Sequence, residues 1–358
     1  MKRSNNLDAF RLLGAVLVII GHAYHLMGRG NEVPFVFGYP ISTLGVVIFF
    51  SISGYLICAS WTRKRSIVPY MAARCLRIFP GLIAVVLLSM LVIGPLVTTM
   101  AVHDYFANDH FLGYATNIRL LPQYDLPGVF TDLPYPNAVN GSLWTLPAEF
   151  FCYLVVPLVC VRWLGVRVPV LFGLLGLSLY LAHVAPQASP VIYGTRLSDA
   201  ASMWVFFIAG SLLRTAQERV PGLFRTDVAV VGLLGQVAMV SLYPTAVIWT
   251  TWVFLPYAIL TAGLASTPYV RRAARYGDLS YGLYLWAFPI QQLVILAAGT
   301  LRMGLDLPLV TILSLCLAWL SWHTIEGPSM RLKDAVLNRM SAPKLTPATT
   351  APAAEPAA

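Results

Sequence analysis

Three observations predict an all-α integral membrane protein with about ten transmembrane helices and both termini in the cytoplasm. The first is composition: 58% of the 358 residues are hydrophobic, only 11% are charged, and the mean hydropathy is +0.72. Soluble domains carry about 45–50% apolar and about 25% charged residues. The second is that the apolar residues gather in runs of about 17–25, the length that crosses a bilayer as a helix. The third is the placement of Lys and Arg.

Ten apolar runs give the expected spans. The 26 Gly, 25 Pro and 9 Trp suit such helices, because Gly and Pro are commoner in transmembrane than in soluble helices and Trp gathers at the membrane interfaces. We expect the spans near residues 8–27, 40–60, 79–101, 142–161, 168–185, 199–214, 226–242, 247–265, 279–299 and 307–325.

Lys and Arg residues divide unevenly between the two sides. With Met1 in the cytoplasm, 20 of the 24 fall at cytoplasmic ends, and only Arg29, Arg119, Arg196 and Arg302 fall outside. This asymmetry follows the positive-inside rule and favours ten spans, because a miscounted span would scramble it. It also accounts for the net charge of +9. No basic block stands apart from the spans, so no nucleic-acid partner is expected.

A single membrane domain is expected over residues 1–340. We interpret 8–27 as a retained span rather than a signal peptide, because the run is long and no small-residue cleavage site follows it. The outside loop 102–141 is rich in Tyr, Pro and Asp and is expected to lie partly ordered over the mouth of the bundle. Residues 341–358 are rich in Pro, Ala and Thr, so we expect a disordered tail. The five Cys have no repeated spacing, which indicates neither a disulfide framework nor a metal site.

Arg11 and His22 are ionisable residues inside the first apolar run, where such residues are functional-site candidates by default. They are eleven positions apart, so they lie on nearly the same helix face, about 16 Å apart along the axis. The alternatives are an Arg11 that extends to the cytoplasmic surface as an anchor and a His22 that packs in the core. The spacing alone leaves both alternatives open.

A second cluster lies in the second cytoplasmic loop, where Arg74 and Arg77 precede Pro80. Positions i and i+3 share one helix face, and Arg binds phosphate oxygens bidentately. The pair could therefore hold a phosphate or pyrophosphate, although the positive-inside rule alone also explains both residues.

Glu149, in the fourth run, is expected at the same depth as His22. Counted from Ser142, Glu149 lies about 10 Å below the outer surface, and His22 lies about 9 Å below it. The carboxylate could then orient the imidazole of a general base. A structural buried pair, or a Glu149 that supports a kink at Pro147, is the alternative.

Polar side chains also open the ninth run. Asp278, Ser280, Tyr281 and Tyr284 could line a cavity, although the tyrosines are equally typical of the membrane interface. Glu326, at the inner end of the last run, is expected to be solvated.

Together these stretches resemble the membrane-bound acyltransferase-3 family of bacterial O-acyltransferases, from Leu7 to about Pro328. The matching stretches are "LDAFR" followed by His22, "GVVIFFSISGYLI" (45–57), "RCLRIFP" (74–80), "SLWTLPAE" (142–149) and "LSYGLYLWAFP" (279–289). Five motifs in the right order and on the predicted sides form a specific combination. The last motif usually contains His where this chain has Ala287, which implies an unusual acceptor.

The resemblance implies an acyl-CoA-dependent O-acyltransferase of the bacterial inner membrane, with no permanently bound cofactor. Its donor would be cytoplasmic acyl-CoA, most simply acetyl-CoA. Its acceptor would be a hydroxyl of an extracytoplasmic or lipid-linked glycan, such as a polysaccharide or lipopolysaccharide. Arg74 and Arg77 would bind the nucleotide phosphates, and Arg11, expected to serve both donor binding and catalysis, would lie beside the donor's arm. His22 would act as general base, with Glu149 orienting it; a transient acyl-histidine is a second route.

Substrate contacts are expected from Trp144, Ser280 and Tyr281. Two other functions stay open. One is acylation of a small hydrophobic metabolite such as a macrolide, and the other is a transporter or flippase. Transporters often show symmetry between halves, whereas here the halves show none and the ionisable residues gather in the first four runs. This pattern favours an enzyme.

Overall fold

A computed structural model describes residues 5–183 and 189–332. These residues form helices and loops apart from two short antiparallel hairpins, so the helical fold class is confirmed. In one hairpin β1 (Phe35–Val36) pairs with β2 (Tyr39–Pro40), and in the other β3 (Val191–Ile192) pairs with β4 (Thr195–Arg196). The expected domain boundary at residue 340 and the tail 341–358 lie outside the described residues.

A long helix overlaps each of the ten predicted apolar runs, although the helix that begins at Ile67 starts twelve residues before the run 79–101. The long helices are α1 (Leu7–Leu26), α2 (Ile41–Lys64), α3 (Ile67–Leu88), α7 (Thr145–Val159), α8 (Leu164–His183), α9 (Leu197–Gln217), α10 (Thr226–Leu242), α11 (Ile248–Leu264), α12 (Ser280–Ala298) and α13 (Met303–Ser321).

Three of these helices have irregular extensions. α3 passes through a π-helical turn (Ser89–Ile93) into α4 (Gly94–Val97), and α13 passes into a second π-helical turn (Trp322–Glu326). A 3-10 turn (Gly141–Trp144) precedes α7. The extension of α13 continues past residue 325, where its predicted run ends, whereas α3 differs at its start, because Ile67 precedes the predicted run 79–101.

The connecting segments contain shorter helices. The long loop before α7 carries α5 (Val102–Ala107), α6 (Asp109–Tyr114) and a 3-10 turn (Ala115–Arg119), so its expected partial order is confirmed. Two further 3-10 turns are Gly30–Glu32 and Val270–Arg272.

Within the described ranges, seven helical segments are long and apolar enough to cross a membrane. They contain α1, α2, α3 with α4, α7, α8, α12 and α13. α10 and α11 are apolar but have 17 residues each, and α9, which carries Asp199 and Arg214, is not among the seven. The chain is therefore a multi-pass membrane protein. Ten spans and cytoplasmic termini remain predictions.

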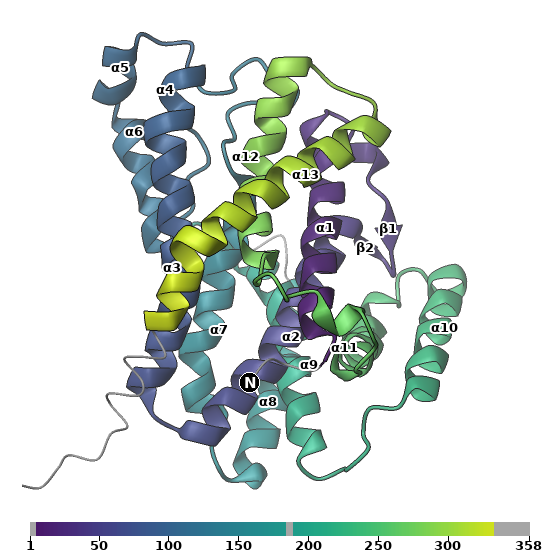
Figure 1. Cartoon of the computed structure of the whole chain (residues 1–358). Helices are drawn as coiled ribbons and strands as arrows, with labels where there is room; N and C mark the ends of the chain where they lie inside the picture. Colours follow the sequence, from purple (N-terminus) through teal and green to yellow (C-terminus); the bar gives the residue numbers. More distant parts are fainter. Residues whose placement is uncertain (1–4, 184–188, 333–358) are drawn as a thin grey trace, which may run out of the picture.

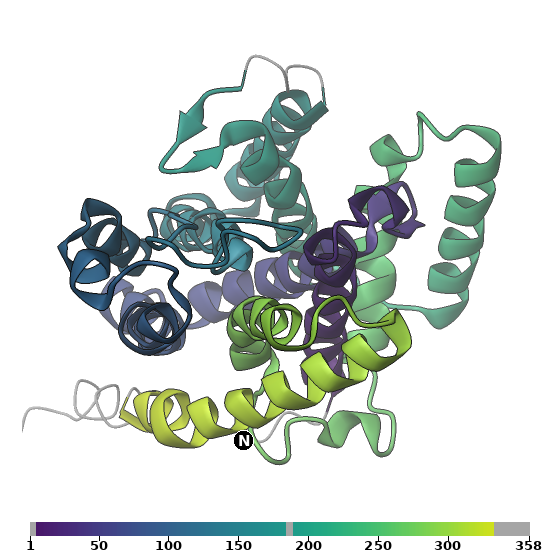
Figure 2. The ribbon, with the colours of Figure 1, turned by 90° about the horizontal axis from the view of Figure 1, so that it is seen from above.

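α1, α2 and α12 form the centre of the bundle. Figures 1 and 2 show α1 beside α12, with α3 and α7 on one side and α10 and α11 on the other. α13 runs obliquely across α12 and α1 (Figure 1). The most extensive helix contacts join α2 to α9, α1 to α2 and α8 to α9. Side chains that face the space between α1, α2, α7 and α12 are therefore enclosed by protein.

Glycines bring α2 close to its neighbours. A Cβ at Gly54 would lie 1.9 Å from the carbonyl oxygen of Phe207 in α9, and one at Gly210 would lie 2.2 Å from that of Ser51. A Cβ at Gly45 would lie 2.4 Å from a backbone oxygen of α1. Close approach of backbones supplies the packing that holds helices together in lipid, where no hydrophobic effect between helices does so.

We expect Gly54→Ala to destabilise the bundle, because the added methyl group collides with rigid backbone of α9 and overpacking costs about 1–3 kcal/mol or more. Gly176→Ala in α8 is the matched control, since nothing lies within 4 Å of a Cβ there. The measurement is recovery of folded protein by size-exclusion chromatography after heating in detergent. Gly54→Ala should lose recovery at a lower temperature than wild type, and Gly176→Ala should not. Equal profiles for the two variants would contradict this account of the α2–α9 contact.

Candidate active site

Four cavities follow one another through the bundle. His22 and Trp144 line the first two, Tyr284 lines the second and third, and Glu149 lines the third and fourth. We call the first two, of about 720 and 230 Å³, the histidine cavities. The third, of about 40 Å³, is the constriction, and the fourth, of about 510 Å³, is the arginine cavity. α1 passes along the whole series, with Arg11 at one end and His22 at the other.

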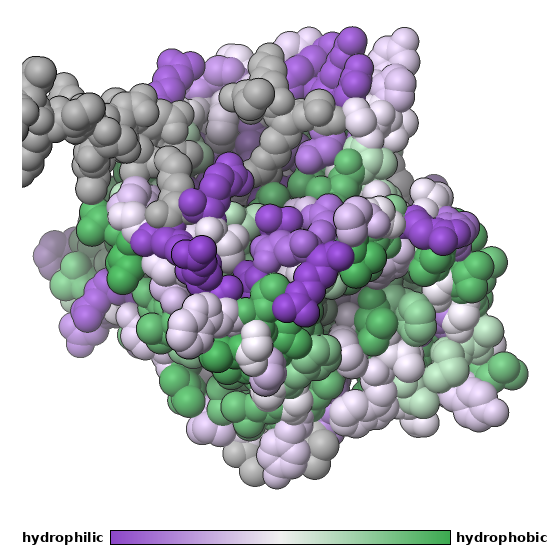
Figure 3. Space-filling model, turned by 90° about the horizontal axis from the view of Figure 1, so that it is seen from below, coloured by the Kyte–Doolittle hydropathy of each residue, from purple (hydrophilic) through white to green (hydrophobic). Residues whose placement is uncertain are grey.

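The arginine cavity is lined by charged side chains of α1, α2, α3 and α7 and of the segment directly before α12. Figure 3 views the molecule from the end at which α1 begins, and hydrophilic residues lie across the middle of that face. Within the described part of the chain, the charged residues that line the cavity are Asp8, Arg11, Arg63, Arg74, Arg77, Glu149 and Asp278. Four arginines thus face three carboxylates, which leaves the cavity positive.

Asp278 joins α1 to α3 across this cavity. Its Oδ2 lies 2.7 Å from Nη2 of Arg77 and 3.8 Å from Nη1 of Arg11, and its Oδ1 accepts a hydrogen bond from Ser280 Oγ at 2.6 Å. Burial opposes ionisation, but the two guanidinium groups outweigh it and lower the pKa of Asp278 to about 2. Asp278 is therefore ionised at physiological pH. The prediction that Asp278, Ser280 and Tyr281 line a cavity is confirmed.

Arg74 and Arg77 line the arginine cavity together, as their spacing on one helix face predicts. The guanidinium carbon of Arg74 lies 5.9 Å from the ring centre of Tyr70 and 5.8 Å from that of Tyr153. That of Arg77 lies 5.4 Å from Tyr281. The aromatic faces hold the cations in place. Nε of Arg74 has no hydrogen-bond partner among the described residues, so this side chain keeps a donor for a bound anion.

Glu149 lies between the arginine cavity and the constriction. Its Oε1 accepts hydrogen bonds from Ser53 Oγ at 3.0 Å and from the hydroxyl of Tyr153. Ser53 belongs to α2 and Tyr153 to the next turn of α7, so two helices fix the carboxyl group. Glu149 is therefore a positioned polar group on the wall of the passage between the two ends.

The structure does not bring His22 and Glu149 together, and their predicted equal depth is wrong. The count from Ser142 assumed that the fourth run begins at the outer surface. Instead this segment begins inside the bundle, because the fully buried Asn140 donates a hydrogen bond from Nδ2 to the carbonyl oxygen of Leu285 at 2.9 Å. Leu285 is only five residues from the start of α12 at the arginine end. Glu149 consequently lies much further from the outer surface than the count from Ser142 predicts.

Aromatic side chains narrow the constriction. Phe49 and Tyr284 meet edge to face with ring centroids 5.9 Å apart, and Val46 and Tyr281 also line this space. The hydroxyl of Tyr284 lies 2.6 Å from Thr145 Oγ1, a hydrogen bond that holds the ring in place. The free volume of about 40 Å³ has room for only a few water molecules.

The histidine cavities lie at the opposite end of α1. His22 packs edge to face on Phe288, with ring centroids 5.3 Å apart, and its buried Nδ1 has no hydrogen-bond partner among the described residues. Trp144 and Asp199 line both cavities with it. The larger cavity is also lined by His25, Tyr124, Tyr135 and Arg196. His22 thus borders the space that a molecule entering from this side would occupy.

The structure also bears on the expectations for Glu326 and Ala287. Glu326 is only 2% exposed and accepts a hydrogen bond from Ser321 Oγ at 2.9 Å, so the prediction that it is solvated is wrong. Ala287 packs in an apolar cluster with residues of α1 and α13, and its neighbour Phe288 is the residue that lines a histidine cavity. A small side chain at position 287 therefore leaves the walls of these cavities in place, and the unusual acceptor stays a prediction.

The structure adds Asp199, Ser53 and Tyr153, which the sequence analysis did not single out. Tyr153 follows Glu149 by four positions, a helical spacing that could have indicated their contact. Asp199 is an acidic residue in the first turn of an expected span, an uncommon place that could have drawn attention to it. Ser53 carries no such signal.

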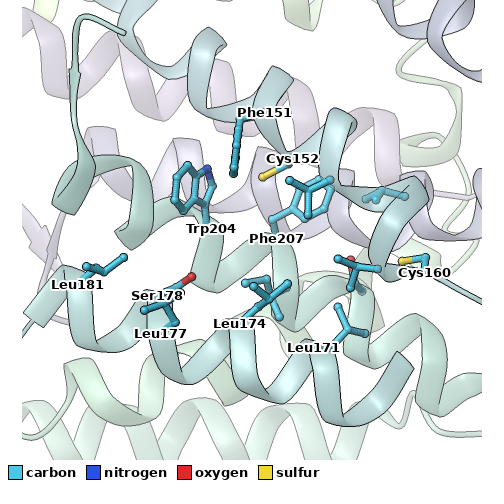
Figure 4. Close-up of a pocket in the computed structure, with 15 residues that line it drawn as sticks. Phe151, Cys152, Cys160, Leu171, Leu174, Leu177, Ser178, Leu181, Trp204 and Phe207 are labelled. Atoms are coloured by element: carbon cyan, nitrogen blue, oxygen red, sulfur yellow. The ribbon is translucent and has the colours of Figure 1, made fainter. Parts of the chain in front are cut away.

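A separate cavity of about 190 Å³ lies between α7, α8 and α9. Figure 4 shows Phe151, Trp204 and Phe207 on its walls, and the hydroxyls among its described lining residues belong to Ser178 and Ser211. No charged side chain of the described residues lines it, and within the same ranges no group of three His, Cys, Asp or Glu could hold a metal ion. The histidine and arginine cavities are therefore the candidate site.

We expect Asp278→Asn to lower the thermal stability, because it leaves Arg11 and Arg77 without their shared counter-charge, at a cost of about 1–3 kcal/mol. The pKa of Asp278 is depressed to about 2 from an ordinary value of 3.8, so its stabilisation is present above pH 3.8 and is lost as the pH falls toward 2. The melting-temperature difference between wild type and Asp278→Asn should therefore stay constant from about pH 5 to about pH 9. Asp227→Asn, which breaks an exposed pair with Arg225, is the control with little expected change. A difference that disappears near neutral pH would contradict the depressed pKa.

Comparison with known proteins supports a single family assignment. The acyltransferase domain of the acyltransferase-3 family matches residues 4–323. The O-acetyl transferase of Shigella phage Sf6 is 30% identical over 334 residues, which cover 91% of this chain and 96% of that protein. Nodulation protein 10 of Rhizobium leguminosarum bv. viciae is 29% identical over 367 residues, covering 94% of this chain and 95% of the relative. No solved structure matches the chain. The chain therefore belongs to the acyltransferase-3 family of membrane acyltransferases, as the resemblance of its motifs predicts.

Proposed function

We propose that the protein is an O-acyltransferase that moves an acyl group, most simply acetyl, from cytoplasmic acyl-CoA to a hydroxyl of an extracytoplasmic or lipid-linked glycan. The observation that carries this proposal is the series of cavities, with arginines at one end, a histidine at the other and a constriction between them. This arrangement suits two substrates that approach from opposite sides and exchange only a small group. A relative named O-acetyl transferase supports the same class of reaction.

The arginine cavity suits the phosphates of CoA. Guanidinium groups bind phosphate oxygens bidentately and stay charged at any physiological pH. Arg11 lies within 4 Å of Asp8 and shares Asp278 with Arg77, whereas Arg74 has no carboxylate within 4 Å among the described residues, so the charge of Arg74 remains for a polyanion. The positive-inside rule places this end in the cytoplasm. Ser280 and Tyr281 line this cavity, so we assign their predicted substrate contacts to the donor.

His22 is the proposed general base. Its imidazole takes the proton of the acceptor hydroxyl while the hydroxyl oxygen bonds to the carbonyl carbon of the thioester. The carbon–sulfur bond then breaks, and the departing CoA thiolate takes up the proton that His22 holds. The products are the acyl ester and free CoA. Transfer through an acyl-histidine is the second route.

The constriction limits what crosses the bundle. An acyl group on the slender arm of CoA can enter it from the arginine cavity, whereas a nucleotide or a sugar is far larger than its free volume of about 40 Å³. This supports group transfer over the transporter or flippase alternative. Ser53 and Tyr153 hold Glu149 on the wall of the passage. Its proposed role is to position the donor's arm, and not to orient the imidazole of His22.

The histidine cavities favour a glycan over a small hydrophobic metabolite. The aromatic side chains of Tyr124, Tyr135 and Trp144 line them beside the polar side chains of Arg196 and Asp199. Specific ligand sites combine apolar and aromatic walls with a few placed polar groups, and a sugar offers both an apolar ring face and hydroxyls. Trp144, which lines both cavities, keeps its predicted role as a substrate contact.

The donor site is tested by acetyl-CoA binding to the protein in nanodiscs. Removal of two charge-assisted contacts in the double variant Arg74→Ala, Arg77→Ala should weaken binding by about 100-fold or more. Arg219→Ala, an exposed arginine that lines no described cavity, is the matched control and should bind like wild type. If wild type binds neither acetyl-CoA nor longer acyl-CoAs, the proposed donor is wrong.

The base is tested separately by release of free CoA from acetyl-CoA. His22→Ala should bind acetyl-CoA like wild type but release CoA at least about 100-fold more slowly, because general-base catalysis contributes about 10²–10⁴-fold. Thiol detection measures the release. Turnover by His22→Ala at the wild-type rate would exclude His22 as the base.

The passage is tested by changing the size of Val46, which lines both the constriction and a histidine cavity. Val46→Phe should fill the constriction and lower transfer by about tenfold or more, while acetyl-CoA binding stays within about threefold of wild type. Val46→Ala, which widens the passage, should retain transfer. Unchanged transfer by a folded Val46→Phe protein would show that the acyl group takes another path.

A further inference from the structure

Asp199 is the one carboxylate that lines the histidine cavities together with His22 in the described part of the chain. It lines both histidine cavities, and the other described residues on those walls include no Asp or Glu. Glu149 lines the constriction and the arginine cavity instead, and its Oε1 accepts hydrogen bonds from Ser53 and Tyr153. The histidine cavities therefore have a carboxylate of their own, and the proposed reaction assigns no role to it.

The β3–β4 hairpin places Asp199 at this site. Its turn residues Tyr193 and Gly194 have φ of 53° and 72°, which bends the chain sharply between the two strands. The hydroxyl of Tyr193 donates to the carbonyl oxygen of Arg119 at 2.8 Å, so the hairpin is tied to the long loop before α7. α9 begins directly after β4, and Asp199 is in its first turn. Its position is built by the fold rather than left on a free loop.

The carboxylate of Asp199 has oxygens available for a ligand. Its side-chain contact in the described residues is a long hydrogen bond of 3.5 Å from Ser198 Oγ to Oδ1. No Lys, Arg or His of the described chain lies within 4 Å of it. An ionised carboxylate has about four lone-pair sites and accepts hydrogen bonds only. It therefore suits a ligand with neighbouring hydroxyl donors.

The charged side chains of the larger histidine cavity also restrict which acceptors can bind there. Arg196 and Asp199 line the same wall region from β4 and α9, and their charges are opposite, so the cavity has no excess of positive charge for an anion when His22 and His25 are neutral. A carboxylate or phosphate on the acceptor next to Asp199 would be repelled. A neutral sugar is not repelled, and its apolar ring face can lie on Trp144.

We propose that Asp199 accepts a hydrogen bond from a hydroxyl adjacent to the one that His22 deprotonates, and so selects a neutral, polyhydroxylated acceptor. This inference rests on the proposed function, because it assumes that the acceptor enters the histidine cavities. Asp199 is then a residue that determines acceptor specificity, while the chemical step stays with His22.

The experiment measures CoA release from acetyl-CoA by the full chain in nanodiscs as acceptor is added. The probes are methyl glycosides of glucose, galactose, mannose and rhamnose, and of glucuronic and galacturonic acids as charged counterparts. Wild type should be stimulated by at least one neutral glycoside and less by either charged glycoside. In Asp199→Asn, the KM for that neutral glycoside should rise about 10- to 100-fold, the range for loss of a charge-assisted hydrogen bond. The ratio of neutral to charged activity should fall.

Two controls separate the possible causes of failure. Asp227→Asn changes the matching first-turn residue of α10, which is exposed and lines no described cavity, and should keep the wild-type KM. Asp199→Glu keeps the charge and should recover part of the neutral-over-charged preference. A wild-type KM in Asp199→Asn, or stimulation only by the charged glycosides or by none, would overturn the inference. If wild type does not bind acetyl-CoA, the proposed function is overturned instead. Because that binding is measured without any acceptor, the two failures can be told apart.

Discussion

A guanidinium group inside a bilayer needs an internal partner, and the arrangement of α1, α3 and α12 around Asp278 meets this constraint. A buried charge without a partner costs far more than one that is paired and hydrogen-bonded. Arg11 and Arg77 share the carboxylate of Asp278, and the tyrosine rings beside Arg74 cover a third cation. Because these polar groups must face inward, the helices enclose a hollow series of cavities rather than a filled core. The glycine contacts of α2 hold the bundle together around that hollow.

The same constraint separates the chemistry into two ends. Positive charge gathers where α1 begins, and the imidazole with its aromatic neighbours gathers where α1 ends, with only a small space between Phe49 and Tyr284. Under the proposed function, one substrate never has to enter the compartment of the other. Selection of donor and acceptor can then depend on different residues, arginines in one cavity and the Trp144 and Asp199 region in the other.

The bilayer made much of the fold predictable. A fixed hydrocarbon thickness sets helix length, so the apolar runs overlap with the long helices, and helical spacing alone placed Arg74 and Arg77 in one cavity. The predictions that failed concerned positions that depend on contacts between distant segments of the chain. The depth of Glu149 could not be counted from the sequence, because the bond from Asn140 to Leu285 draws the start of α7 into the bundle. Asp199 reaches the site through a hairpin docked on another loop, and loops carry no periodic pattern from which such docking could be inferred.

The constriction also has an electrical consequence. Where water fills the wide cavities at both ends, the membrane voltage falls mainly across the short septum formed by Val46, Phe49 and Tyr284. Moving one elementary charge through the full potential takes about 2.3 kcal/mol per 100 mV. Under the proposed function, the acetyl group that crosses the septum is uncharged, so its passage would involve no electrical work, and the CoA phosphates would stay on their own side of the field. The septum would then insulate the membrane during the exchange, and the membrane voltage would neither drive nor oppose the transfer.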